Sequence, residues 1–302
     1  MGALDGKVAV ITGAGRGVGR AEALLLAQEG ATVVVNDVGG GWDGTGRDER
    51  PAQLVVDEIT SAGGQASANY DDIGSWDGAA ALIGQAIERH GQLDILVNNA
   101  GILRDKMMFN MTEEDWDAVL RVHLKGHAAT THHACAYWRD QAKGGRQLSG
   151  AVVNTASESG LFGIRGQGNY GAAKAGIANL TRVTAIEMAK YGIRANGICP
   201  RARTRLITET FGDSMMKVPE DPNAFDAWAP ENIAPLVAFL ASDKASHISG
   251  HMFVVTGGLV QLAKPWEPGP QIDKGARWTV DELGGEIDKL FEGIPSAIQS
   301  IT

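Results

Sequence analysis

The chain has 302 residues, of which 40 are glycine and 44% are hydrophobic. The glycines follow no regular period and form no Gly/Ser-rich run, so the composition excludes a collagen-like fibre, a linker and a disordered chain. The 27 basic and 36 acidic residues give a net charge of −9, which argues against nucleic acid or an anionic membrane surface as a partner.

Two cysteines, Cys135 and Cys199, lie far apart and fit no metal-ligand spacing. They predict neither a disulfide framework nor a zinc site, and they are typical of a reducing compartment. The sequence shows no signal-peptide pattern and no apolar run of the ~18 residues that a membrane helix needs. We therefore expect a cytoplasmic protein with no bound metal.

Short β-branched runs alternate with longer stretches of helical period. This pattern predicts an α/β fold, a Rossmann-like doubly wound parallel sheet of about seven strands with helices on both faces. The seven expected strands are 8–12, 32–37, 65–70, 93–98, 151–155, 194–198 and 252–256.

Two further stretches predict helices. Thr112-Glu113-Glu114-Asp115 resembles a capping box and opens a helix that should run to about Lys143. Residues 279–291 read as one amphipathic helix in a stretch that starts with several prolines and glycines. We expect residues 1–260 to form a single domain, and residues 261–302 to be an extension that packs on this domain or on a neighbouring subunit.

The first expected strand leads directly into a glycine-rich turn, Thr12-Gly13-Ala14-Gly15-Arg16-Gly17-Val18-Gly19, which opens a helix. A strand, a glycine turn and a helix in this order place bare backbone and a helix N-terminus against a pyrophosphate. A purely structural turn is the alternative. The order of elements favours dinucleotide binding by Thr12, Gly13, Gly15, Arg16, Gly17, Val18 and Gly19.

Asp37 ends the second expected strand, where a carboxylate can accept hydrogen bonds from a ribose diol and repels a 2′-phosphate. It predicts NAD in preference to NADP. Arg16 favours the opposite, because a guanidinium can clamp a 2′-phosphate. Asp72 and Ile73 either hold the adenine, by an amide hydrogen bond and an apolar face, or simply start the helix near Ser75.

Asn98-Asn99-Ala100-Gly101 ends the fourth strand, and Ser157 follows the fifth. Tyr170 and Lys174 stand four residues apart, which on a helix puts an ammonium near a phenol and favours the phenolate. Tyr170 would then exchange a proton with a substrate hydroxyl, while Ser157 donates to the carbonyl oxygen.

These motifs resemble the short-chain dehydrogenase/reductase family, whose pattern TGxxxGxG, NNAG, Ser and YxxxK occurs here in order over roughly residues 5–260. The resemblance implies hydride transfer between a nicotinamide and a carbonyl or secondary alcohol. It implies Tyr170 as acid/base, Lys174 on the nicotinamide ribose, where it lowers the Tyr170 pKa, and Ser157 on the substrate oxygen. The cofactor would also be bordered by Asn99, Ala100, Gly101, Pro200 and Thr204.

Two positions depart from the family pattern. His123 stands where much of the family has an asparagine that completes a proton relay. Either its side chain supports the relay, or its backbone carbonyl does so through water. Arg201 replaces the usual glycine after Pro200, which predicts a narrower or more cationic pocket.

Residues 98–105, 122–126 and 166–170 also look like the dehydrogenase part of peroxisomal multifunctional enzyme type 2. That group oxidises (3R)-hydroxyacyl-CoA with NAD and acts on 17β-hydroxysteroids. The resemblance implies a bulky, CoA-linked or steroid-type alcohol as substrate, and the wider family implies a homodimer or homotetramer. The alternatives are an NADPH-dependent ketone reductase and a catalytically silent nucleotide sensor; Ser157, Tyr170 and Lys174 count against the sensor.

Overall fold

The computed structural model describes residues 2–206, 208, 216–221, 223–264 and 266–294. The chain divides into two compact units, Met1–Ala263 and Lys264–Thr302. No helix in the described ranges is long and apolar enough to cross a lipid bilayer.

The first unit is built on an eight-stranded sheet in the order β3-β2-β1-β4-β5-β6-β7-β8. All neighbouring strands are parallel except β7 and β8, which are antiparallel. The strands are β1 Val8–Thr12, β2 Thr32–Asn36, β3 Gln65–Asn69, β4 Ile95–Asn98, β5 Gly150–Thr155, β6 Ile193–Pro200, β7 Met252–Thr256 and β8 Leu259–Ala263. The predicted doubly wound sheet is confirmed, and its order reverses between β1 and β4.

The eighth strand was not predicted, because the expected domain ended at residue 260 and residues 261–263 were assigned to the C-terminal extension. Thr256 pairs with Leu259, so only Gly257 and Gly258 form the turn between β7 and β8. Gly257 has a φ of +51°, which favours glycine at this position. A two-residue Gly-Gly turn between apolar runs is a hairpin signal that the sequence does contain.

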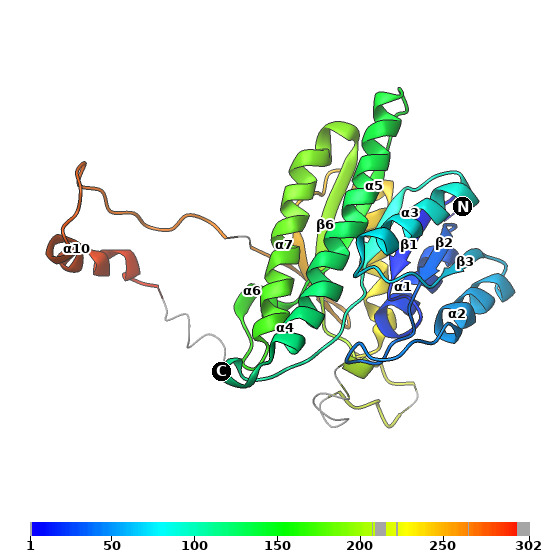
Figure 1. Ribbon diagram of the computed structural model, residues 1–302, viewed down its shortest axis with the longest axis horizontal. Helices are drawn as coiled ribbons and strands as arrows, with labels where there is room; N and C mark the ends of the chain where they lie inside the picture. Colours follow the sequence, from blue (N-terminus) through cyan, green and yellow to red (C-terminus); the bar gives the residue numbers. More distant parts are fainter. Residues whose placement is uncertain (1, 207, 209–215, 222, 265, 295–302) are drawn as a thin grey trace. The chain divides into compact units, whose positions relative to one another are not determined.

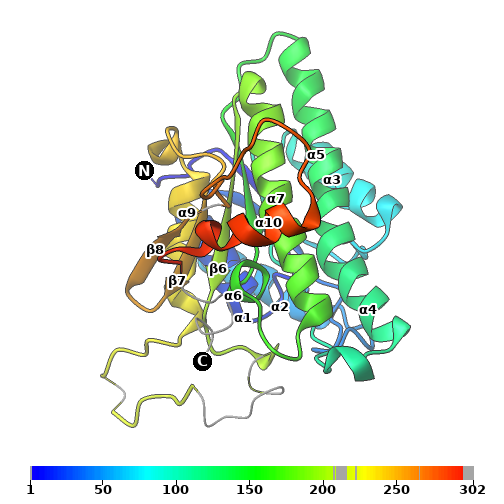
Figure 2. The same ribbon diagram turned by 90° about the vertical axis from the view of Figure 1, so that its left-hand side faces the viewer.

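Helices cover both faces of the sheet (Figures 1 and 2). On one face, α1 contacts both α2 and α9, and on the other α5 contacts both α3 and α7. These helices are α1 Gly17–Gln28, α2 Arg50–Ser61, α3 Trp76–His90, α5 Gly126–Lys143, α7 Gly168–Met188 and α9 Ala234–Ala241. The shorter ones are α4 Glu113–Leu120, α6 Glu158–Phe162 and α10 Val280–Glu286. Single 3₁₀ turns occupy Met108–Asn110, Ala189–Tyr191, Pro230–Asn232, Asp243–Ala245 and Ile287–Phe291.

Alternation along the strands divides the core in two. Ala9 and Ile11 of β1 pack in the cluster that includes α1, α2 and α9, whereas Val8 and Val10 pack in the cluster that includes α3, α5 and α7. Successive side chains of a strand point to opposite faces. A central strand therefore needs apolar residues at every position, which explains the uninterrupted runs in the sequence.

The helix expected from Thr112 to Lys143 begins with the predicted capping box between Thr112 and Asp115. It consists of α4 and α5 joined by one π-helical turn at Arg121–Lys125, which contains His123. A π turn inserts an extra residue into a helix and is frequent at functional sites.

The second unit contains α10, which Thr279 and Glu282 cap at its N-terminus. The 3₁₀ turn Ile287–Phe291 follows it. The expected helix over residues 279–291 is therefore present as a short α-helix and a tighter final turn.

Candidate active site

The carboxyl ends of β1 and β4 are joined by side-chain and backbone hydrogen bonds. The Thr12 hydroxyl oxygen accepts from the amides of Asn99 (3.0 Å) and Ala100 (3.1 Å). The Asn99 side chain donates to the carbonyl oxygens of Thr12 (3.0 Å) and Gly13 (3.1 Å). These bonds hold the glycine turn after β1 against the carboxyl end of β4, the neighbouring strand in the sheet.

The turn itself requires glycine at Gly13. This residue has a φ of +65°, and a Cβ added to it would lie 2.7 Å from the Ala100 Cα. The backbones of the two strand ends therefore meet with no room for a side chain, so the motif predicted from the sequence has a direct steric reason.

The N-terminus of α1 suits an anion. Its N-cap residue, Arg16, makes no capping hydrogen bond with its side chain, and the first turn holds no acidic residue. The first backbone amides of a helix lack intrahelical partners, and the helix dipole makes this end positive. Gly17, Val18 and Gly19 present these amides, as the binding of a dinucleotide pyrophosphate would require.

Asp37 lies directly after β2 and joins two loops. One carboxylate oxygen accepts from the Gly15 amide (2.9 Å) and the other from the Gly39 amide (2.6 Å). A carboxylate has further lone pairs, so it can still accept from a ribose diol. The Arg16 guanidinium, which could clamp a 2′-phosphate, donates instead to the Gly40 carbonyl oxygen at 3.4 Å.

Four other residues were expected at the cofactor, and each has different contacts: Asp72, Ile73, Pro200 and Thr204. Asp72 accepts from the Gly74 amide (2.8 Å) and forms an ion pair with Arg121 (2.6 Å), while Ile73 is 4% exposed in the core. Asp72 and Ile73 are separated by Gly74 from Ser75, which caps α3. Pro200 ends β6, and Thr204 lies against Gly17, with its Cγ2 3.5 Å from a Cβ added there.

The three residues predicted to carry the chemistry come together beyond β5. Ser157 caps α6, and its side chain lies near enough to Tyr170 to favour the phenolate. Lys174 is buried on α7, donates to the Thr155 carbonyl oxygen at 2.5 Å, and lies 5.4 Å from the centre of the Tyr170 ring. The i, i+4 spacing thus places an amine beside the phenol, as expected.

Burial changes the proton affinities of both groups. It raises the pKa of Tyr170 to about 12, although the nearby Ser157 side chain opposes the rise. It lowers the pKa of Lys174 to about 7. The depressed Tyr170 pKa expected from the sequence is therefore not found in the chain alone, because desolvation disfavours the charged form of each group. With Lys174 charged, the phenolate gains a cation beside it.

The His123 side chain is held between the Ile102 backbone and the Tyr170 ring. Its Nε2 lies 3.0 Å from the Ile102 amide nitrogen and 2.8 Å from the Ile102 carbonyl oxygen. Its ring meets the Tyr170 ring edge-on at 5.2 Å, and burial lowers its pKa well below 6.5. A Cβ added at Gly101 would lie 2.3 Å from the His123 ring, so glycine at 101 makes room for a neutral imidazole.

Asn169 is a site residue that the sequence reasoning did not assign. It is fully buried, accepts from the Tyr170 amide (2.7 Å), and donates to the carbonyl oxygens of Arg104 (3.1 Å) and Asp115 (3.0 Å). A polar residue directly before the tyrosine, at the start of the helix, was the available signal. It fixes the helix turn from which Tyr170 projects.

Two arginines after β6 have carboxylate partners. Arg201 forms a two-pronged ion pair with Glu158, the neighbour of Ser157. Arg203 pairs with Asp226. The charge of Arg201 is therefore balanced next to the site, which limits the cationic character predicted for this pocket. No cluster of metal-ligating side chains occurs in the described part of the chain.

Comparison with known proteins agrees with this geometry. The family model described as Enoyl-(Acyl carrier protein) reductase matches residues 13–260. The hydroxyacyl-CoA dehydrogenase ChsB1 of Mycobacterium tuberculosis is 46% identical, over 96% of this chain and 90% of its own. The chain belongs to the short-chain dehydrogenase/reductase family.

Further relatives are consistent with this family. Mouse peroxisomal multifunctional enzyme type 2 is 41% identical over 87% of this chain, which corresponds to 33% of that longer enzyme. A crystal structure of a short chain dehydrogenase from Mycobacterium avium has a TM-score of 0.86 and 50% identity, and the match covers 98% of each chain. This short-chain dehydrogenase/reductase is thus an oxidoreductase that acts on CH–OH groups with a nicotinamide cofactor.

Proposed function

We propose that this short-chain dehydrogenase/reductase oxidises the secondary hydroxyl of a 3-hydroxyacyl-CoA with NAD. The arrangement of Ser157, Tyr170 and Lys174 carries the reaction type, because it puts a hydroxyl donor, a phenol and an amine at one strand end. The substrate class is supported by ChsB1, a hydroxyacyl-CoA dehydrogenase, and by the resemblance to the multifunctional enzymes.

Four residues have separate roles in this proposed reaction. Ser157 donates a hydrogen bond to the substrate oxygen and holds it beside Tyr170. The Tyr170 oxygen takes the hydroxyl proton during oxidation and returns it during reduction. Lys174 stabilises the phenolate by its charge, and the neutral His123 supports the Tyr170 ring. The bound nicotinamide supplies the hydride acceptor and, when oxidised, a positive charge.

The test of the substrate is a screen that follows reduction of NAD. It uses 3-hydroxyacyl-CoA, steroid-side-chain CoA, free hydroxysteroids and small alcohols, with Tyr170→Phe as the inactive control. We expect turnover with a CoA-linked substrate. Activity confined to free hydroxysteroids or small alcohols would refute the acyl-CoA assignment, and absence of all turnover would favour a nucleotide sensor.

The preference for NAD rests on Asp37. Its carboxylate is fixed by the amides of Gly15 and Gly39 at the end of β2, where it can accept from a ribose diol and would repel a 2′-phosphate. Fluorescence titration should give at least about tenfold tighter binding of NAD than of NADP, and Asp37→Asn should narrow this ratio. Tighter binding of NADP would favour the alternative, an NADPH-dependent ketone reductase using Arg16.

We also propose a homodimer or homotetramer. The edge strand β8 exposes Leu259, Val260 and Leu262, each half or more exposed. An exposed apolar edge strand favours association. Sedimentation velocity should show a species larger than the monomer, and a monomer at micromolar concentration would contradict this.

A further inference from the structure

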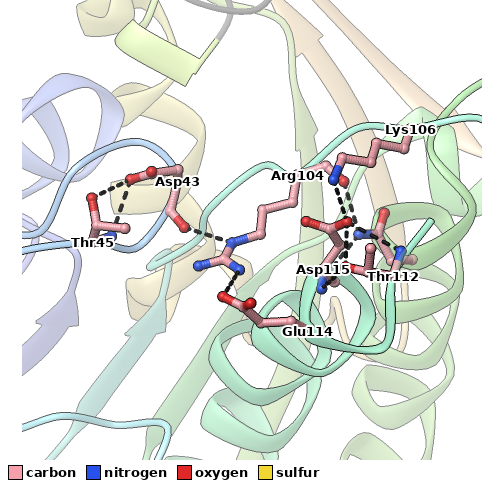
Figure 3. A network of polar contacts seen from close by, with 8 residues as sticks. Asp43, Thr45, Arg104, Lys106, Thr112, Glu114 and Asp115 are labelled. Atoms are coloured by element: carbon pink, nitrogen blue, oxygen red, sulfur yellow. Dashed lines mark hydrogen bonds and ion pairs between the residues drawn. The ribbon is translucent and has the colours of Figure 1, made fainter. Parts of the chain in front are cut away.

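The segment that follows Gly101, residues 102–106, lies between two parts of the site that are distant in sequence. On one side is the glycine-rich loop after β2, which we call the adenosine loop and define as residues 38–49. On the other side is the first turn of α7, which carries Tyr170. Figure 3 shows the polar contacts of Arg104 and its neighbours in this region.

The side chain of Arg104 fastens the adenosine loop. Its Nε donates to the Asp43 carbonyl oxygen at 3.0 Å, and its Nη1 forms an ion pair with Glu114 of α4 at 2.9 Å (Figure 3). The preceding amide, that of Leu103, donates to the Trp42 carbonyl oxygen at 3.0 Å. The adenosine loop is thus bonded at two successive carbonyls to residues 103–104.

The two contacts of the Arg104 side chain differ in environment. The Arg104 side chain is 16% exposed, whereas that of Glu114 is 84% exposed. An exposed ion pair contributes little, because water and salt screen it. The hydrogen bond to the Asp43 carbonyl is partly buried, so its loss leaves a polar backbone group without its partner.

The backbone of Arg104 holds the other side. Its carbonyl oxygen accepts from Asn169, whose own oxygen accepts from the Tyr170 amide. The neighbouring Lys106 pairs with Asp115 at 2.6 Å, and its backbone bridges to Gln167, just before α7. One residue therefore contacts the adenosine loop by its side chain and the support of Tyr170 by its carbonyl.

The adenosine loop in turn bears on the ribose site. The Gly39 amide donates to the Asp37 carboxylate at 2.6 Å, and the Asp48 amide closes the loop onto the Val38 carbonyl oxygen at 3.1 Å. A shift of this loop would therefore move one of the two amides that orient Asp37. The connection from Asp37 to Tyr170 thus runs through the Gly39 amide and the backbone of the adenosine loop to Asp43, and from there by hydrogen bonds through Arg104 and Asn169.

We propose that Arg104 is a positioning residue that couples dinucleotide binding at the adenosine loop to the placement of Tyr170. This inference rests on the proposed function, since it deepens the role of the same site. Removing the guanidinium should weaken the dinucleotide and also slow hydride transfer at saturating dinucleotide. A residue that served the loop alone would affect only the first of these.

The experiment compares Arg104→Met, Arg104→Lys and Glu114→Gln with the wild type. Methionine keeps an apolar stem and removes every donor, lysine keeps a single cationic donor, and Glu114→Gln removes the ion pair while leaving the bond to the Asp43 carbonyl. Each protein is tested for dinucleotide affinity by fluorescence titration, for kcat at saturating dinucleotide, and for folding by circular dichroism and Tm.

We expect Arg104→Met to weaken dinucleotide binding about tenfold and to lower kcat about tenfold, because small misplacements of a catalytic group are costly. Arg104→Lys should fall between this variant and the wild type, and Glu114→Gln should stay within about threefold on both measures. An unchanged kcat in both folded Arg104 variants would overturn the coupling, whatever the affinity does. An effect of Glu114→Gln equal to that of Arg104→Met would overturn the assignment to the Asp43 contact.

Both constants are measured with whichever dinucleotide and alcohol the wild type turns over. If the proposed cofactor or substrate is wrong, the wild type itself will fail to turn it over. An incorrect role for Arg104 appears only in the comparison among variants.

Discussion

Replacing Glu22 by glutamine should stabilise the chain at alkaline pH and change it little at acidic pH. Glu22 lies on α1 and is fully buried, and neither carboxylate oxygen has a hydrogen-bond partner among the described residues. Burial raises its pKa from 4.5 to about 8. The cause is the cost of placing an unpaired charge in apolar surroundings.

The size and sign of the effect follow from proton linkage. The unfolded chain releases the Glu22 proton near pH 4.5 and the folded chain near pH 8. Between these values the folded state binds more protons, so its stability falls as the pH rises. At about 1.4 kcal/mol for each pKa unit, the full loss is about 5 kcal/mol, of which about 4 kcal/mol falls between pH 5 and pH 8.5.

The assay is guanidinium unfolding of the wild type and Glu22→Gln at several pH values across this range. Their difference in unfolding free energy cancels the titration of all other groups. It should grow by about 4 kcal/mol in favour of the variant as the pH rises. Glu88→Gln, at an exposed position on α3, is the control and should show no such trend. A difference between Glu22→Gln and the wild type that stays constant with pH would refute the argument.

Three other predictions concern the site and its supports. Tyr170→Phe should lower kcat about a thousandfold while dinucleotide affinity stays within about threefold, and a kcat near that of the wild type would disprove the acid/base role. Gly101→Ala should lower the free energy of unfolding in urea by about 1–3 kcal/mol, because its Cβ would lie 2.3 Å from His123. Gly84→Ala is the control: it lies inside α3 with open space around the added Cβ, and it should raise the free energy of unfolding by about 1 kcal/mol. Arg194→Met should lower stability by about 2–4 kcal/mol, since the buried guanidinium donates to the carbonyl oxygens of residues 240 and 242 at the end of α9. A Tm equal to that of the wild type would contradict this last prediction.

The sequence predicted the parallel sheet well because each strand is a local signal. Runs such as Val33-Val34-Val35 are apolar at successive positions, and only strands covered on both faces need that. The residues proposed for the chemistry were equally accessible, since Ser157, Tyr170 and Lys174 occur at fixed places relative to strands. The β8 strand was missed although Gly257-Gly258 marks its hairpin.

Contacts between distant loops could not be predicted in this way. Arg104 and Asp43 are 61 positions apart. They meet only because their loops follow β4 and β2, two parallel strands on either side of β1 whose carboxyl ends lie at the same end of the sheet. The position of Asn169 before Tyr170 is visible in the sequence, but its contacts are not predictable, because its acceptors are backbone carbonyls that every residue has. The raised pKa of Tyr170 likewise depends on burial, which the i, i+4 spacing does not report.

The π turn at Arg121–Lys125 limits which insertions and deletions the catalytic region can accept. In a regular α-helix one added residue rotates everything after it by about 100° around the helix axis, whereas a π turn takes up one extra residue within a single turn. Beyond the turn, Thr130 and Thr131 both bond with the Asn98 side chain. Deleting a single residue between the π turn and Thr130 would therefore rotate these threonines away from β4. In chimeras made with related enzymes, the number of residues between Gly126 and Thr130 should therefore be kept, together with His123 in the π turn.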